Sequence, residues 1–346
     1  MNTSSRRNFL SSSAALLATA SLSPIVGSCQ RSSRPSFPGI DDFGSNFGGV
    51  QIGCTTYSWR NMPAGLENTV KYCRETGINS IELRMYLEEY LGVPENPTQR
   101  ILREAREAQQ ASGAPAERGA RPELTPEQQA EIDKYNADLK AFRLGMPPEK
   151  IAAVKKMFDD AGVGIHIWKA TPAKWSDEEI DYAFKTAKAL GAKGITEEIS
   201  ERAVRRMAPF AEKHNMYAIF HNHAQFAREN FNIDTFLDVS PAVMLNFDVG
   251  HYFGSTGLNP CDFMRKYHER IFSIHIKDKT GPNTDPSNAN QVWGQGETPL
   301  IEILTLIKKE GWQIYVDIEL EHPVKPWLNE VKETKTCVQF ARNILI

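Results

Sequence analysis

The sequence has little of what several classes of protein require. Only five cysteines occur in 346 residues and no two form a Cys-x-x-Cys pair, so neither a disulfide scaffold nor a cysteine-rich zinc site is indicated. Lysine plus arginine (40) nearly balances aspartate plus glutamate (43), which gives no reason to expect nucleic acid or an anionic membrane surface as a partner. No glycine-rich phosphate cradle is present either, so phosphorylated ligands are not indicated. The chain is long enough for one large barrel or two ordinary domains.

A long apolar segment is also missing. The mildly hydrophobic run from Ser11 to Ile25 is too short to span a membrane stably, and it follows Ser5-Arg-Arg-Asn-Phe-Leu10. This arrangement resembles a twin-arginine export signal rather than a buried helix. We therefore expect residues 1–29 to be an export signal, residues 30–48 a linker rich in Ser, Pro and Gly, and the protein to be periplasmic.

Cys29 ends a short pattern, Val26-Gly-Ser-Cys29, that resembles a lipobox. On this resemblance Cys29 would be lipidated and would tether the protein to a membrane. The alternative is cleavage nearby, with Cys29 discarded or left in the linker. Twin-arginine cargo folds before export, so the other cysteines are expected to be buried thiols: Cys54, Cys73, Cys261 and Cys337.

The rest of the chain alternates between short β-rich segments and segments with helical spacing of apolar residues. The expected strands begin at residues 50, 79, 163, 192, 216, 243, 271 and 313. The expected helices are Ala64 to Thr76, Asp177 to Leu190, Glu201 to His214, Pro260 to Tyr267, Leu300 to Glu310 and Val331 to Asn343. Eight βα repeats predict a single α/β domain, a (β/α)8 TIM barrel over residues 49–346.

One region, at about residues 94–150, breaks this alternation. It is rich in Arg, Glu, Gln and Ala and is punctuated by Gly and Pro. We expect two polar helices around a loose connection, inserted after the second strand. A solvated helical excursion is the simpler interpretation, and a lid over the site is the functional one.

In such a barrel the functional residues lie at the carboxyl ends of the strands, where the βα loops form one mouth. Ionisable and aromatic residues recur at these positions: Tyr57, Glu82, Arg84, Trp168, Glu197, Glu198, His221, His223, Asp248, His251, His275, Lys277, Asp317, Glu319 and Glu321. Buried carboxylates and imidazoles would repel or protonate one another unless a cation neutralised them. The sequence thus predicts a divalent metal ion, and this mixed donor set suits Mn, Zn, Co or Mg.

Five motifs in the C-terminal half resemble those of a known family: Phe220-His-Asn-His223, Asn246-Phe-Asp-Val-Gly-His251, Ile274-His-Ile-Lys-Asp278, Trp293-Gly-Gln-Gly-Glu297 and Tyr315-Val-Asp-Ile-Glu319. They resemble the xylose isomerase-like TIM barrel superfamily, and within it the sugar phosphate isomerase/epimerase group. The resemblance implies that Asp248, His275 and Glu319 bind metal. It also implies that His251 and Lys277 contact substrate.

The fourth metal ligand is the point at which the sequence departs from the family. Many relatives place a Glu at the end of the fifth strand, where this chain has His221. We expect Glu198, one strand earlier, to bind the metal in its place, with His221 or His223 as the alternatives. Glu82, Arg84, Trp168, His221 and His223 are expected to contact substrate.

The chemistry expected of such a site is proton transfer next to a sugar carbonyl. A metal can stabilise the resulting enediolate, and two carboxylates, here Glu198 and Glu319, can remove and return the proton. The predicted function is a metal-dependent isomerase or epimerase of a free or keto sugar. A keto-sugar lyase, dehydratase or hydratase could use the same site, and a non-catalytic sugar-binding lipoprotein is the alternative from another class. An abasic-site endonuclease is disfavoured for two reasons. It needs ligands for several metal ions, but the connection from Lys279 to Gln291 contains no His. It also needs a basic groove for DNA, whereas the net charge of this chain is negative.

Overall fold

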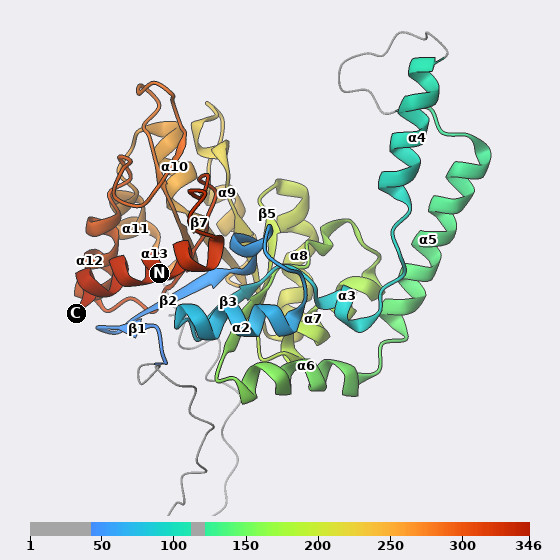
Figure 1. The fold of residues 1–346 in the computed structure, drawn as a ribbon, viewed down its shortest axis with the longest axis horizontal. Helices are drawn as coiled ribbons and strands as arrows, with labels where there is room; N and C mark the ends of the chain where they lie inside the picture. The colour runs from blue at the N-terminus through green and yellow to red at the C-terminus, as the bar shows by residue number, and fades with distance from the viewer. Residues whose placement is uncertain (1–42, 112–121) are drawn as a thin grey trace, which may run out of the picture.

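The computed structural model describes residues 43–111 and 122–346 (Figure 1). The expected export signal, Cys29 and most of the expected linker lie outside these residues. Among the helices of the described part, none is long and apolar enough to cross a bilayer.

Eight parallel strands form a closed barrel. They are β2 (Val50–Thr55), β3 (Ser80–Leu83), β4 (Gly164–Trp168), β5 (Gly194–Glu198), β6 (Tyr217–His221), β7 (Val243–Asp248), β8 (Ile271–Ile276) and β11 (Tyr315–Ile318). Each strand pairs with the next, and β11 pairs with β2 to close the ring. The predicted TIM barrel is therefore confirmed, and the strands begin close to where the sequence placed them. A short strand, β1 (Asn46–Phe47), adds to β2 in the antiparallel direction.

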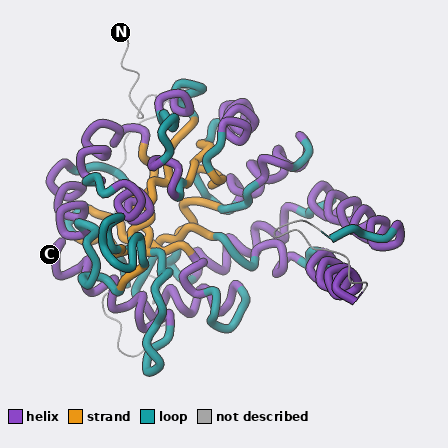
Figure 2. Tube along the Cα trace, turned by 90° about the horizontal axis from the view of Figure 1, so that it is seen from above, coloured by secondary structure: helices purple, strands orange, loops and turns teal. Residues whose placement is uncertain are grey.

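Helices surround the barrel strands on the outside (Figure 2). The longer ones are α2 (Leu66–Thr76), α6 (Pro148–Asp160), α7 (Asp177–Ala189), α8 (Glu201–His214), α11 (Pro260–Tyr267), α12 (Leu300–Glu310) and α13 (Glu330–Leu345). Each buries one apolar face on the sheet and exposes a polar one: α12, for example, buries Ile303 and Ile307 and exposes Lys308. Cys54, Cys73, Cys261 and Cys337 are buried free thiols in this layer of the core, as expected.

Short elements fill the connections at both ends of the barrel. They are α3 (Leu87–Leu91), α9 (Asp234–Leu237), α10 (Val249–Thr256), the β9 (Asp278–Lys279) and β10 (Asn290–Gln291) hairpin, and the 3-10 turns η1 (Thr56–Trp59), η2 (Pro172–Lys174), η3 (Ala224–Ala227) and η4 (His268–Arg270). Asp278 anchors the loop after β10, because its carboxylate accepts hydrogen bonds from the backbone N–H groups of Gly294, Gly296 and Thr298. The Trp-Gly-Gln-Gly-Glu motif is thus fixed by a buried aspartate.

The expected insertion is a pair of helices between β3 and β4, namely α4 (Thr98–Ala111) and α5 (Pro126–Leu144). They project from the barrel on the side of the βα loops (Figure 1). A capping box formed by Thr125 and Gln128 starts α5, and an ion pair between Arg100 and Glu131 links the two helices. Both termini of the insertion therefore lie beside the barrel mouth.

Arg143, near the end of α5, fastens the insertion to the barrel. Its guanidinium donates to both carboxylate oxygens of Glu88 on α3, at 2.8 and 3.0 Å, and to Glu179 on α7 at 3.0 Å. It also stacks on the Trp175 ring, 3.4 Å from the centroid. A buried, bidentate contact of this kind fixes orientation as well as position.

Candidate active site

Four neighbouring strands bring together a buried group of two imidazoles and two carboxylates, which we call the four-residue cluster. His221 ends β6, Asp248 ends β7, His275 lies in β8, and Glu319 follows β11. One ligand atom from each lies within 4.8 Å of all the others, and all four side chains are buried. Because parallel strands end at one edge, residues separated by about 100 positions in the sequence meet here.

The contacts inside the cluster are short. His275 Nδ1 lies 3.0 Å from Glu319 Oε2, and His221 Nε2 lies 3.4 Å from Asp248 Oδ2. The other oxygen of Asp248 caps α10 by accepting from the backbone N–H of His251 at 2.7 Å. Tetrahedral ligands of a zinc ion would lie roughly 3.4 Å from one another, so a small contraction from the 4.8 Å limit of the cluster would enclose a divalent ion. The donor set also suits such an ion.

Lys277 occupies the space between the cluster and its neighbours. Its Nζ lies 2.9 Å from Asp248 Oδ2, 2.6 Å from Glu319 Oε2 and 2.7 Å from Glu321 Oε2. Burial opposes the charge, but the three carboxylates raise the pKa of Lys277 above its ordinary value. Burial likewise opposes the ionisation of Asp248, yet the cation of Lys277 and the nearby imidazoles hold the pKa of Asp248 well below its usual range. The carboxylates are therefore ionised, the state in which they bind a cation.

Glu82 lies fully buried against the cluster. Its Oε2 is 3.2 Å from His275 Nε2 and accepts a hydrogen bond from Asn246 Nδ2 at 2.6 Å. Burial raises the carboxyl pKa, but His275 outweighs this effect and lowers the pKa of Glu82 to about 2. Glu82 and Asn246 thus hold the His275 ring from the side opposite Glu319. No role was predicted for Asn246, although it begins the Asn246-Phe-Asp-Val-Gly-His251 motif.

Glu198 lies on the outer side of His221. Its Oε2 is 3.1 Å from both His221 Nδ1 and His223 Nε2, and its Oε1 accepts from Lys169 Nζ at 2.6 Å. Burial opposes ionisation, but the two imidazoles and Lys169 hold the pKa of Glu198 far below its ordinary value. The geometry thus groups His221 with Asp248, His275 and Glu319, whereas Glu198 and His223 form a second group that shares His221.

The other expected substrate contacts line the approach to the cluster. His251 Nε2 lies 3.3 Å from Lys277 Nζ, and burial lowers the pKa of His251 to about 4, so its ring is neutral at pH 7. Arg84 Nη1 lies 3.9 Å from Glu319 Oε1, and its guanidinium stacks on Tyr57 at 3.8 Å. Lys169 was not predicted, although it directly follows Trp168 at the end of β4 and the strand-end rule applies to it equally.

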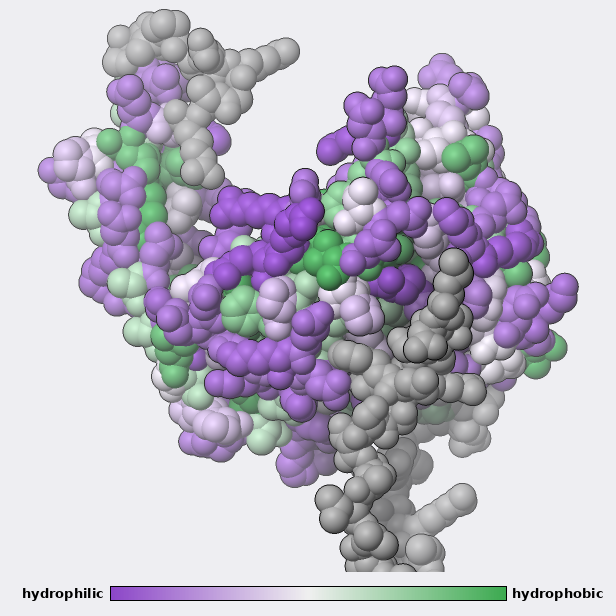
Figure 3. Space-filling view, turned by 180° about the vertical axis from the view of Figure 1, so that it is seen from behind, coloured by the Kyte–Doolittle hydropathy of each residue, from purple (hydrophilic) through white to green (hydrophobic). Residues whose placement is uncertain are grey.

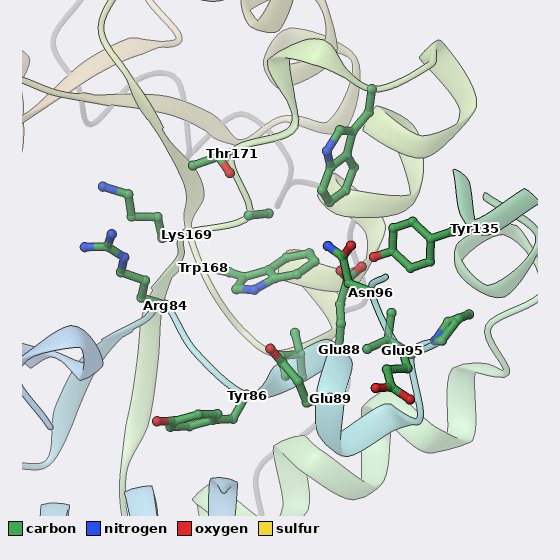
Figure 4. A pocket seen from close by; sticks show the side chains of 15 residues that line it. Arg84, Tyr86, Glu88, Glu89, Glu95, Asn96, Tyr135, Trp168, Lys169 and Thr171 are labelled. Atoms are coloured by element: carbon green, nitrogen blue, oxygen red, sulfur yellow. The ribbon is translucent and has the colours of Figure 1, made fainter. Parts of the chain in front are cut away.

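A cleft of about 510 Å³ adjoins this site (Figure 4). Arg84, Trp168 and Lys169 line it on the barrel side, and Tyr135 of α5 lines it on the insertion side. Figure 3 shows the surface hollowed between the insertion and the barrel, with mostly hydrophilic residues around the hollow.

Fold and site together define an α/β barrel with a candidate divalent-metal centre at its C-terminal mouth. Residues 130–343 match the sequence profile of the xylose isomerase-like TIM barrel family, and the chain belongs to this family. No curated protein gives a significant match.

Several solved structures share the fold. A sugar phosphate isomerase/epimerase from Parabacteroides distasonis is 17% identical, with a TM-score of 0.56 over 90% of this chain and 100% of its own. The IolI protein with a bound zinc atom is 14% identical, with a TM-score of 0.55 over 86% and 98%. The probable 3-DHS dehydratase AsbF from Bacillus anthracis is 13% identical, with a TM-score of 0.51 over 84% and 98%. At these identities the likeness shows a common fold.

Proposed function

We propose that the protein is a divalent-metal-dependent sugar isomerase or epimerase that works by proton transfer through an enediolate. The observation that carries the proposal is the four-residue cluster, in which two buried, ionised carboxylates and two imidazoles converge at the barrel mouth. Family membership supports it. So do the names of structures with the same fold, which include a sugar phosphate isomerase/epimerase and a protein with bound zinc.

His221, Asp248, His275 and Glu319 would hold the ion, which would supply Lewis acidity toward the carbonyl and hydroxyl oxygens of a sugar. Glu319 is suited to move the proton. Its Oε2 is bonded to His275 and Lys277, whereas its Oε1 faces Arg84 at 3.9 Å. This leaves Oε1 as the basic atom on the substrate side.

Glu198 is the second carboxylate of the proposed pair. Its side chain is 40% exposed at the mouth, where a substrate proton can reach it. Lys169 and His223 hold it in place. Lys277 and His251, whose side-chain nitrogens lie 3.3 Å apart beside the cluster, are the residues proposed to hydrogen-bond substrate hydroxyl groups.

Elimination is the second candidate reaction. An enediolate can expel a neighbouring substituent instead of being reprotonated, and one protein with the same fold is named a probable dehydratase. Lys169, which donates to Glu198 at 2.6 Å, would place an acidic proton beside such a leaving group.

Deuterium exchange tests this proposal. The purified protein would be incubated with free and keto sugars in deuterated water, with Mn²⁺, with a chelator, and with metal restored. We expect exchange at the carbon next to the carbonyl, its loss on chelation and its recovery with metal. Binding without exchange for every sugar tested would instead indicate a sugar-binding protein.

We also propose export by the twin-arginine route to the periplasm, with Cys29 as a membrane tether. This proposal is supported by the Arg6-Arg7 pair, the short apolar run and the lipobox-like segment. A periplasmic enzyme meets free sugars and glycosides, in agreement with the absence of a phosphate cradle from the sequence.

A further inference from the structure

The cleft between the barrel mouth and the insertion borders the candidate metal centre, because two residues that line it also contact carboxylates there. Two cations at its inner end, Arg84 and Lys169, contact the two carboxylates proposed to move the proton: Arg84 lies 3.9 Å from Glu319 and Lys169 lies 2.6 Å from Glu198. Figure 4 shows these two cations on one side of the cleft and Tyr135 on the opposite side, with the Trp168 indole between them. A molecule held at the metal centre would therefore extend into the cleft.

The walls of the cleft combine rings with hydrogen-bond acceptors. Tyr86, Trp175 and Tyr135, which are partly exposed, supply aromatic surface, whereas Trp168 is only 3% exposed and contributes little. Such rings pack against the apolar C–H face of a sugar ring, whereas carboxylates accept hydrogen bonds from its hydroxyl groups. Glu89 and Glu95 provide these acceptors at the outer end, where they would also repel an anionic group. The lining therefore suits a neutral polyhydroxylated ring.

The two sides of the cleft are fastened together by the side chain of Arg143. Arg143 joins α5 to α3 through Glu88 and to α7 through Glu179, and it covers one face of Trp175. The volume of about 510 Å³ also falls within the roughly 300–1,000 Å³ typical of small-molecule sites. Preformed sites lose less free energy on ordering when they bind.

From these observations we propose that the cleft is a subsite for a second, neutral sugar unit. The substrate is then a disaccharide or a related glycoside: one ring reacts at the metal centre, and the other lies in the cleft against Tyr135. The identity of the reacting ring rests on the proposed function, whereas the subsite itself rests on the geometry of the cleft.

Calorimetric binding with matched pairs of sugars tests the subsite. Glucose would be compared with cellobiose and maltose, and galactose with lactose, on the Zn²⁺-loaded protein and again in a chelator. We expect at least one disaccharide to bind about tenfold more tightly than its monosaccharide. Tyr135→Ala should remove most of that difference while leaving monosaccharide affinity unchanged.

Tyr90→Ala is the matched control, because Tyr90 is 42% exposed on α3 and does not line the cleft. Glu89→Ala is the second cleft variant, should Tyr135→Ala fold poorly. The subsite is overturned if no disaccharide binds more tightly than its monosaccharide, or if the cleft variants behave like the control. Tight disaccharide binding without deuterium exchange would overturn the proposed reaction and leave the subsite standing.

Discussion

At the residue scale, His221 is the side chain that the two groups of candidate ligands at the mouth have in common. Its Nε2 faces Asp248 and its Nδ1 faces Glu198, so one imidazole belongs to both groups. The cluster geometry favours His221 as the fourth ligand and makes Glu198 the residue that orients its ring. Removing a carboxylate that orients a ligating histidine typically weakens metal binding by about 10–100-fold.

A first prediction follows for metal affinity. His221→Ala should weaken binding of Mn²⁺ or Zn²⁺ by more than about 100-fold, whereas Glu198→Gln should cost about 10–100-fold or less, because it removes only an orienting charge. Isothermal titration of the metal-free variants measures both. A larger loss for Glu198→Gln than for His221→Ala would assign the fourth position to Glu198.

A second prediction concerns turnover. Glu319→Gln should reduce proton exchange by about 10²–10⁴-fold or more, since it removes a proposed base and a proposed ligand together. Glu310→Gln, at the exposed end of α12, is the matched control and should leave the rate unchanged. Circular dichroism would verify that both variants are folded. An active Glu319→Gln variant would remove this residue from the mechanism.

How much of the site could be predicted at this scale depends on strand register. The sequence placed His221, Asp248, His275 and Glu319 at strand ends, and the structure brings them together. How deeply each side chain is buried was harder to predict. Glu82 is fully buried next to a register shift, between Ile81 and Glu82, in the pairing of β3 with β4. No sequence pattern marks such an irregularity.

At the element scale, the attachment of the insertion to the barrel depends on Arg143. A third prediction is that Arg143→Ala loosens α5, because it leaves Glu88 and Glu179 without their partner at a mostly buried position, at a cost of about 3–5 kcal/mol. Hydrogen exchange of the α5 amides should rise in this variant. Arg100→Ala is the control within the same insertion: its ion pairs are exposed to solvent, so its loss should leave the protection of α5 almost unchanged. Equal protection in the two variants would contradict the role of Arg143.

The sequence predicted the strands and long helices because their apolar periodicity is strong, but it missed α10. This helix starts directly at Asp248 without a loop, and Gly250 and Gly254 make it resemble a turn. Both glycines are required by packing: a Cβ at Gly250 would lie 2.3 Å from Lys277 Cγ, and one at Gly254 would lie 2.3 Å from Asn288 Oδ1. Close tertiary contacts of this kind leave no mark on local periodicity.

At the scale of the whole molecule, the proposed export would decide which sugars the proposed enzyme meets. A fourth prediction is that changing Arg6 and Arg7 together to Lys stops translocation, since the arginine pair would be the element that the export route recognises. Fractionation with an antibody against the mature chain measures this, and a Cys29→Ala variant separates export from membrane attachment. Normal translocation of the double-lysine variant would refute the signal.

Anomalous diffraction from crystals soaked in Mn²⁺ tests most directly whether the four-residue cluster at the barrel mouth is a divalent-metal centre. We expect one anomalous peak enclosed by His221, Asp248, His275 and Glu319, with Lys277 Nζ moved away from Asp248 and Glu319. A peak at Glu198 and His223 alone, or no peak at the mouth, would contradict it.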